Sequence, residues 1–176
     1  MKSLRCGYFY DILITKKANI AKLKDGEMDL KRFTRENNYT VSGCNGSDKA
    51  FLVDKLVDYN LSQVPATQEE NFIDLSRKVL SEDGKIIAGI IVRMYCWKCI
   101  YIDTFWIDES MRGEGLGTLL FEEVERVAKE NGSHLIHLDT FDFQAKDFYL
   151  AHGYSVFGEL EDCPKGHTRY FMSKVL

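Results

Sequence analysis

Apolar and polar residues alternate along the chain in two different periods, one typical of helices and one typical of strands. Between Asp48 and Gln63 the apolar residues recur every three or four positions, which predicts a helix capped by Ser47 or Asp48. A second helical stripe begins at Leu116 and continues to about Glu130, where Asn131-Gly132 predicts its end. These two amphipathic segments frame the middle of the chain.

The strand pattern is strongest between the two helical segments. Lys85–Tyr95 and Cys99–Asp108 are rich in Ile, Val and aromatic residues, and we expect Ile86–Met94 and Ile100–Ile107 to form an antiparallel pair. Further strands are predicted at His134–Thr140, at Tyr154–Leu160 and Arg169–Val175, and at Tyr39–Ser42. Asp142 is expected to cap a helix that continues to His152, whereas Asn71–Leu80 fits a helix and a strand equally well.

The order of these elements predicts an α/β or α+β domain with a mixed sheet. Within residues 1–38 the pattern is weaker, with a strand at Cys6–Ile14 and a short helix at Asp29–Glu36 as the only expectations. The chain has 176 residues, which fits one domain with a core of its own. Residues 1–38 are therefore interpreted as an N-terminal extension, and residues 39–176 as the domain.

Composition and charge narrow the class of protein. The net charge of −4 gives no broad basic surface, so nucleic acid is not an expected partner. No apolar run approaches the roughly 18 residues of a membrane helix, so no membrane contact is expected. The five cysteines cannot all be paired in disulfides, because their number is odd. The single Cys96-x-x-Cys99 motif has no second motif that could complete a zinc site. We therefore expect reduced thiols, no metal and a cytoplasmic location.

A glycine-rich segment follows the strongest strand and opens the second helix. It reads Arg112-Gly113-Glu114-Gly115-Leu116-Gly117-Thr118. Glycine permits backbone angles that turn N–H groups inward, and a helix N-terminus adds unpaired donors and partial positive charge. This combination suits a phosphate group, to which Arg112 could add a charged contact. A plain glycine turn before a helix is the alternative interpretation.

Two common phosphate motifs do not fit this segment. A P-loop requires Lys and Ser/Thr after the last glycine, but Thr118-Leu119 follows Gly117. A dinucleotide site requires Gly-x-Gly-x-x-Gly after the first strand of a parallel unit. Here Thr118 occupies the position of the third glycine, and the preceding strand is expected to be antiparallel to its neighbour.

Two motifs together resemble the GNAT N-acetyltransferase superfamily. Arg112-Gly113-x-Gly115-x-Gly117 is similar to its Arg/Gln-x-x-Gly-x-Gly/Ala acetyl-CoA signature. Phe148-Tyr149-x-x-x-Gly153-Tyr154 resembles its Phe-Tyr-x-x-x-Gly-Phe/Tyr motif, at the family's distance along the chain. The resemblance covers residues 39–176. It implies a mixed, mostly antiparallel central sheet with a splayed strand pair, helices on both faces, and acetyl-CoA as co-substrate.

The resemblance also implies which residues receive acetyl-CoA. The diphosphate would lie on the backbone N–H groups of Gly113, Glu114, Gly115, Leu116, Gly117 and Thr118, next to Arg112. The pantetheine arm would lie between splayed strands around Phe105, Trp106 and Ile107 on one side and Leu138–Thr140 on the other. A backbone N–H near Ile107 would receive the oxyanion. Phe148 belongs to the second motif, and the acetyl group would pass directly to an amine.

Transfer to an amine requires a base and, for the departing thiolate, an acid. Tyr149 matches the position of the family's frequent acid. Asp103 is a carboxylate inside an apolar strand, and it is the predicted base. A solvent-facing or salt-bridged residue on an edge strand is an equally good interpretation of Asp103. Glu109 is the alternative, and His137 and Asp139 share a strand face from which they could assist a water relay.

The expected function is acetylation of a primary amine of a small molecule, with a protein amine as the other acceptor considered. A non-catalytic acyl-CoA-binding module and a nucleotide-binding enzyme are the alternatives, and a homodimer is left open.

Overall fold

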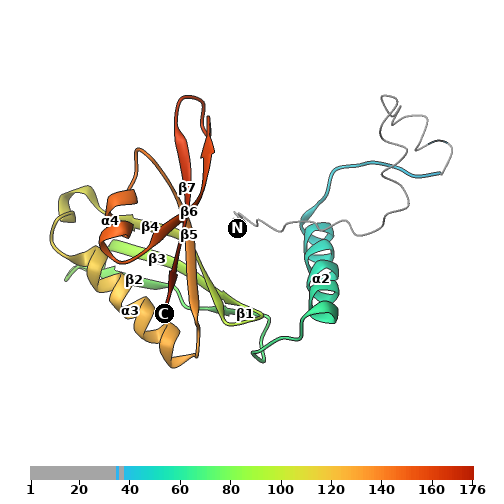
Figure 1. Cartoon of the computed structure of the whole chain (residues 1–176), viewed down its shortest axis with the longest axis horizontal. Helices are drawn as coiled ribbons and strands as arrows, with labels where there is room; N and C mark the ends of the chain where they lie inside the picture. Colours follow the sequence, from blue (N-terminus) through green and yellow to red (C-terminus); the bar gives the residue numbers. More distant parts are fainter. Residues whose placement is uncertain (1–34, 36–37) are drawn as a thin grey trace. The chain divides into compact units, whose positions relative to one another are not determined.

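The structure of the chain is a computed structural model that describes residue 35 and residues 38–176 (Figure 1). The strand expected at Cys6–Ile14, and the helix expected at Asp29–Glu36 except for residue 35, lie outside the described residues. Contacts divide the chain between Leu56 and Val57, and the unit Val57–Leu176 contains all strands found in the described residues. The predicted division at residue 38 stays a prediction.

The first described helix, α2, comprises Gly46–Gln63, close to the predicted bounds. Its cap is Asn45 rather than Ser47 or Asp48. The Asn45 carboxamide oxygen accepts the Asp48 backbone N–H at 3.0 Å, and the Asp48 carboxylate accepts the Asn45 backbone N–H at 2.8 Å. This reciprocal pair satisfies two N–H groups at once, so the helix begins earlier than predicted. The strand predicted at Tyr39–Ser42 is wrong, because that segment is neither strand nor helix.

Among the described residues, seven strands form one mixed sheet in the order β1-β3-β4-β5-β7-β6, with β2 also paired to β3. Their bounds are β1 Phe72–Asp74, β2 Arg77–Leu80, β3 Ile86–Tyr95, β4 Cys99–Ile107, β5 Leu135–Phe141, β6 Ser155–Glu161 and β7 Thr168–Val175. Every pair is antiparallel except β4 with β5. The predicted mixed, mostly antiparallel sheet is confirmed, and the ambiguous segment Asn71–Leu80 forms two short strands.

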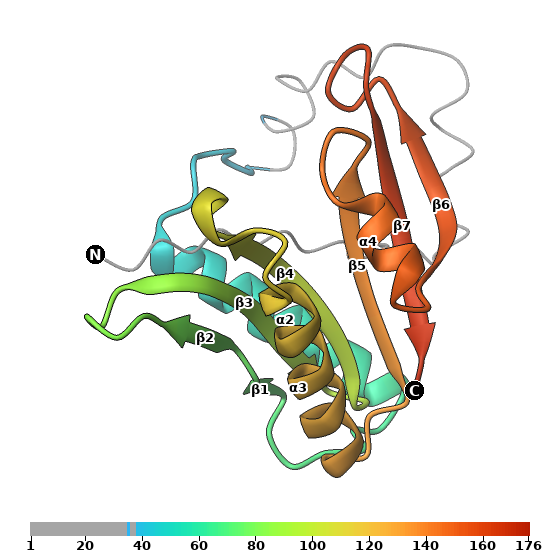
Figure 2. The same ribbon diagram turned by 90° about the vertical axis from the view of Figure 1, so that its left-hand side faces the viewer.

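The parallel pair is short, and its strands separate. β4 and β5 are in register only over Cys99–Ile102 and Leu135–Leu138, after which they diverge toward their C-terminal ends (Figure 2). β4 is also irregular at this point. Ile102 pairs with Val92 on β3 whereas Thr104 pairs with Ile91, so Asp103 is an extra residue in a β-bulge. The predicted splayed pair is therefore present, and the bulge coincides with its origin.

Helices α3, Leu116–Glu130, and α4, Lys146–Ala151, lie over one face of the sheet, visible as two helices in front of the strands in Figure 2. The apolar stripe of α3 buries Leu120, Phe121, Val124 and Val127 against the strands. The helix expected from Asp142 starts only at Lys146, because residues 142–145 form turns. Asp142 does not cap it, since its carboxylate accepts the backbone N–H of Thr168 at 3.2 Å.

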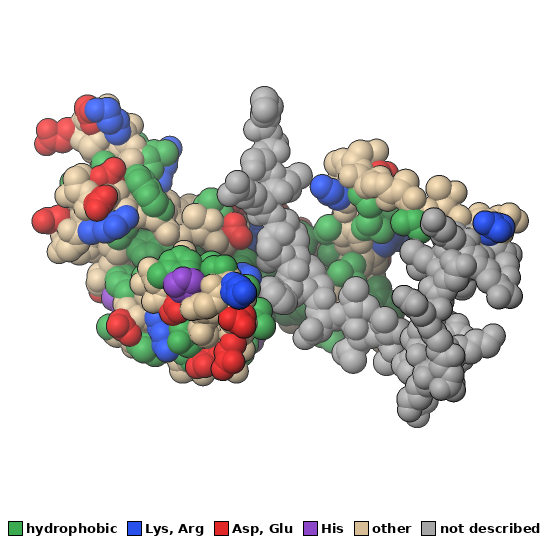
Figure 3. Space-filling view, turned by 90° about the horizontal axis from the view of Figure 1, so that it is seen from above, with side chains coloured by type: hydrophobic (Ala, Val, Ile, Leu, Met, Phe, Trp, Pro, Cys, Tyr) green, Lys and Arg blue, Asp and Glu red, His purple; other side chains and the backbone are tan. Residues whose placement is uncertain are grey.

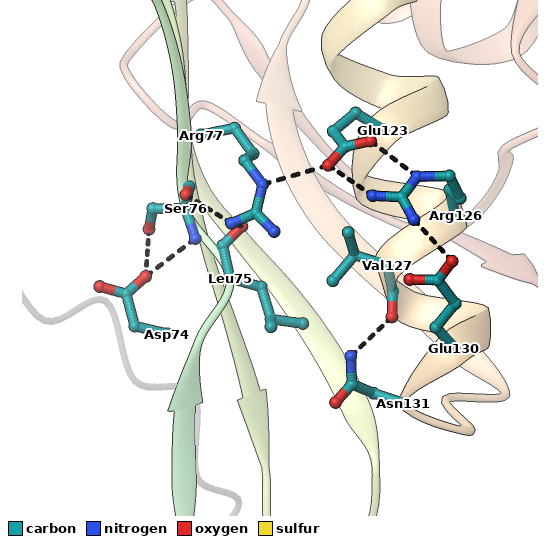
Figure 4. A network of polar contacts seen from close by, with 9 residues as sticks. All are labelled: Asp74, Leu75, Ser76, Arg77, Glu123, Arg126, Val127, Glu130 and Asn131. Carbon is teal, nitrogen blue, oxygen red and sulfur yellow. Dashed lines mark hydrogen bonds and ion pairs between the residues drawn. The ribbon is translucent and has the colours of Figure 1, made fainter.

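Ion pairs fix the outer side of α3 to the edge of the sheet. The Glu123 carboxylate accepts hydrogen bonds from Arg126 at 2.8 and 2.9 Å and from Arg77 of β2 at 3.4 Å (Figure 4). Arg126 also pairs with Glu130 one turn later. Because these side chains are partly exposed, each pair contributes little, and their main effect is to hold α3 in place beside β2.

Candidate active site

The glycine segment connects the end of β4 to α3 through a short 3-10 helix, Glu109–Met111. Asp108 caps this helix by accepting the Ser110 backbone N–H at 3.0 Å. Gly113 and Gly115 then adopt φ angles of +84° and +81°, and Gly115 is the N-cap of α3. Both values lie in the left-handed region that side chains rarely tolerate, so these two glycines are required by the backbone.

The segment presents a row of unpaired donors. Within the described part of the chain, none of the backbone N–H groups of residues 113–118 donates a hydrogen bond. Internal pairing first appears at Leu119, whose N–H donates to the Gly115 carbonyl at 3.0 Å. The α3 dipole adds partial positive charge at the same place, so the segment can bind an anion. The Arg112 guanidinium donates to the Ile107 carbonyl at 3.3 Å, which holds this cation beside the end of β4.

Gly117 serves a different purpose from the other two glycines. A Cβ atom there would lie 3.0 Å from Cε2 of Phe148 and 3.2 Å from Cζ of Phe105. These two rings stack on each other with centroids 5.5 Å apart. Gly117 therefore lets the first turn of α3 approach the ring pair closely, and the ring pair supports the glycine segment. The sequence assigned Phe105, Phe148 and Gly117 to the cofactor site without showing this mutual packing.

The gap between β4 and β5 is flanked by two carboxylates. Asp103 follows Ile102 and Asp139 follows Leu138, the last residues that pair across the two strands. The Asp139 carboxylate accepts the Tyr101 hydroxyl at 2.9 Å and the Arg169 guanidinium at 2.8 Å. The only hydrogen bond found for the Asp103 carboxylate in the described residues comes from its neighbour Thr104, at 3.5 Å. The Asp139 carboxylate is therefore occupied by two hydrogen-bond donors, whereas the Asp103 carboxylate is available to accept a proton.

Tyr101 and Arg169 belong to this site although sequence reasoning did not select them. Arg169 reaches Asp139 because β7 pairs with β5, a register that no sequence pattern shows. Burial, and next the Asp139 charge, raise the pKa of the Tyr101 hydroxyl. His137 lies on the same face, with its Nε2 atom 2.9 Å from the Tyr95 hydroxyl. Burial lowers the pKa of this imidazole, which favours its neutral form.

Tyr149 of α4 lies on the other side of the gap, in the aromatic cluster. Its ring is buried among Phe105, Phe121 and Phe148. Burial, with a smaller contribution from Asp139, raises its pKa to about 12, so the phenol stays protonated at neutral pH. No hydrogen-bond partner of its hydroxyl is found among residues 38–176. A protonated, unpaired hydroxyl near the gap can donate to a leaving group.

The other side chains that the family resemblance assigned to the site lie in varied surroundings. The Thr140 hydroxyl is buried toward α4 and donates to the Gln144 side chain at 3.2 Å. The Trp106 side chain points to the opposite face, where it borders a cavity of about 420 Å³ lined also by Gly89, Ile91 and Thr104. Ile107 and Leu116 pack against the core, whereas Glu109 and Glu114 are exposed.

The cysteine motif spans the turn between β3 and β4, and Cys99 is the first residue of β4. Cys96 and Cys99 are free thiols, and burial raises the pKa of both. No cluster of three or more His, Cys, Asp or Glu side chains suited to a metal ion occurs in the described residues. Among these residues there is also no helix with the length and apolarity needed to cross a membrane.

Comparison with known proteins gives consistent matches. Residues 50–154 match the model of the acetyltransferase (GNAT) family. The chain is 33% identical over 96 residues to the blasticidin-S acetyltransferase of Streptomyces morookaense, an alignment that covers 54% of this chain and 70% of the relative. A crystal structure of an acetyltransferase from Bacillus cereus ATCC 14579 is 37% identical and superposes with a TM-score of 0.72, covering 80% of this chain and 99% of that one.

A more distant structure shares the fold. An aminoglycoside 6'-N-acetyltransferase complexed with coenzyme A is 16% identical and superposes with a TM-score of 0.53, over 84% of this chain and 87% of that one.

Proposed function

Because the chain belongs to the GNAT acetyltransferase family and is an acetyl-CoA-dependent enzyme, we propose that it acetylates a primary amine of a small molecule. The names of the relatives support a small acceptor, since one acetylates blasticidin S and a structural neighbour acetylates aminoglycosides. The acceptor of this chain is expected to be a compound of comparable size that carries a free amine.

One observation carries the donor half of this proposal. The six unpaired N–H groups of residues 113–118 line the N-terminus of α3 directly after the splayed strand, with nothing within 4 Å of a side chain placed at Gly113 or Gly115. A diphosphate is the anion that can use several adjacent donors together. The thioester would then extend along the gap toward Asp103 and Tyr149, where both strand edges offer unpaired main-chain groups.

The reaction proposed at the gap is direct attack within a ternary complex. A free amine is mostly protonated at neutral pH, because its pKa is near 10, and must lose a proton before it can attack. Asp103 accepts that proton, directly or through a water molecule. The amine nitrogen then bonds to the thioester carbonyl carbon, the carbon–sulfur bond breaks, and Tyr149 donates its proton to the departing thiolate. The backbone N–H near Ile107 is proposed to stabilise the oxyanion.

The donor assignment is tested with Gly115→Asp. The substitution adds a side chain at a positive φ and a negative charge among the donors, so acetyl-CoA binding should be lost in calorimetry. Gly84→Asp is the matched control, because Gly84 has φ +80° and equally open surroundings in the β2–β3 turn. Retained acetyl-CoA affinity in Gly115→Asp would remove the phosphate assignment.

The acceptor class is tested with a panel of amines, by following release of CoA thiol. Turnover of at least one small amine, with acetylated product identified by mass spectrometry, is the expected result. If thiol release stays at background across the panel while acetyl-CoA still binds, the chain is an acyl-CoA-binding module instead.

A further inference from the structure

A hydrogen-bonded chain of side chains links the glycine segment to the end of α4. The Thr118 hydroxyl, in the first turn of α3, lies 3.1 Å from Nε2 of His152. Nδ1 of His152 lies 2.7 Å from the Phe148 carbonyl oxygen. A carbonyl only accepts hydrogen bonds, so Nδ1 must carry a proton. In the neutral imidazole Nε2 is then the acceptor, and the Thr118 hydroxyl donates to it.

With His152 neutral, the Thr118 hydroxyl oxygen is unfavourable for a bound anion. When the Thr118 hydroxyl donates to His152, its oxygen lone pairs remain for any ligand beside the free N–H groups of residues 113–118. A phosphate oxygen needs donors and is repelled by those lone pairs. Protonation of His152 reverses the polarity of the contact, because Nε2–H then donates to the Thr118 oxygen. The hydroxyl proton is released toward the ligand, and a positive charge is added nearby.

We propose that His152 is a positioning residue that couples proton uptake to binding of the acetyl-CoA diphosphate, acting through the Thr118 hydroxyl. The inference rests on the proposed function, since it needs the diphosphate on the glycine segment. Binding favours the protonated imidazole, so affinity for CoA is expected to rise as pH falls.

The surroundings of His152 hold its ring in place. Its ring packs on Phe148 with centroids 4.1 Å apart and on Phe121 of α3 at 6.0 Å. The charged groups facing it are Lys174 of β7, whose ammonium donates to the His152 carbonyl at 2.8 Å, and Glu125 of α3, which accepts from Lys174 at 2.7 Å.

The positive charge of Lys174 and the negative charge of Glu125 largely cancel, because the two groups form an ion pair. The phenols of Tyr149 and Tyr154 stay protonated because burial raises the pKa of both. The strongest new charge at this position is therefore the bound diphosphate.

Calorimetric titration with CoA tests the proposal. Wild type, His152→Gln and Thr118→Val are titrated at several pH values in buffers of different ionisation enthalpy, which gives the number of protons taken up. Glutamine offers a neutral amide N–H to Thr118 at all pH values. The protons of CoA itself ionise identically with every variant, so the difference between variants isolates the contribution of the chain.

Wild type should take up more protons than His152→Gln, by up to one per CoA. The ratio of their affinities should change by up to tenfold per pH unit. Thr118→Val should lose most of the extra uptake, and Thr118→Ser, which keeps the hydroxyl, should retain it. Circular dichroism confirms that each variant is folded.

Equal proton uptake by wild type and His152→Gln would overturn the proposal. Full uptake by Thr118→Val would overturn the relay and leave only a long-range charge effect. The test also separates this inference from the donor assignment. If Gly115→Asp abolishes CoA binding while His152→Gln behaves as wild type, only the coupling fails. If Gly115→Asp binds CoA normally, the donor site itself is wrong.

Discussion

Gly117→Ala perturbs the contact between the glycine segment and the stacked rings of Phe105 and Phe148. The added methyl group would lie 3.0 and 3.1 Å from two carbons of Phe148 and 3.2 Å from one carbon of Phe105. Carbon atoms in contact prefer about 3.5 to 4.0 Å, so all three contacts overlap. Overpacking of this kind costs about 1 to 3 kcal/mol, against at most about 1 kcal/mol that alanine gains over glycine in a helix.

The strain should be relieved by moving the first turn of α3, and with it the N–H groups that are proposed to bind the diphosphate. A loss of about 1.4 kcal/mol in binding corresponds to a tenfold weaker affinity. We therefore expect the KM for acetyl-CoA to rise about tenfold while kcat changes little. Thermal unfolding should begin at a lower temperature, by about 2 to 4 °C for each kcal/mol.

A second substitution shows whether the rings cause the effect. Phe148→Leu removes the ring tip that meets the new methyl group, so in that background Gly117→Ala should cost less than it does alone. Gly84→Ala is the control for a loss of stability away from the site, since its φ of +80° should lower the melting temperature and leave the KM unchanged. Wild-type KM and melting temperature in Gly117→Ala would refute the close packing as a determinant of donor binding.

Three further predictions concern the reaction and its pH dependence. Tyr149→Phe should lower kcat more than tenfold with little change in acetyl-CoA affinity, and unchanged turnover would limit Tyr149 to packing. Asp103→Asn should lower kcat/KM by about 10²-fold or more, measured with the preferred amine below its pKa; a normal value would assign deprotonation to another group. Because the pKa of Tyr149 is raised to about 12, the unfolded chain loses this proton first as pH rises above about 10. The free energy of unfolding should therefore fall between pH 10 and 12, less steeply in Tyr149→Phe; equal slopes in denaturant titrations would contradict the raised pKa.

Much of the sheet and both main helices could be predicted because their patterns are local. The periodicity that ends at Glu130 and the apolar strands Ile86–Met94 and Ile100–Ile107 are set by neighbouring residues, and the structure has them close to those bounds. The start of α2 was misplaced because its cap depends on a reciprocal side-chain pair between Asn45 and Asp48.

The candidate site was predictable in its main-chain parts and less so in its side-chain contacts. The positive φ angles of Gly113 and Gly115 follow from glycine spacing, whereas the role of Gly117 depends on rings from β4 and α4. The bulge at Asp103 depends on the register between β3 and β4, and the pair Asp139–Arg169 depends on the register between β5 and β7. Registers are long-range properties that a local pattern does not contain.

The separation of β4 from β5 has a consequence for how this enzyme can change over generations. The opening is bordered by peptide groups, which every amino acid except proline supplies alike. Replacement of an exposed side chain along Asp103–Ile107, such as Thr104 or Trp106, therefore leaves the peptide groups along the opening unchanged. If the acceptor amine enters here as proposed, the residues that contact it can diversify while the peptide groups proposed to hold acetyl-CoA stay the same.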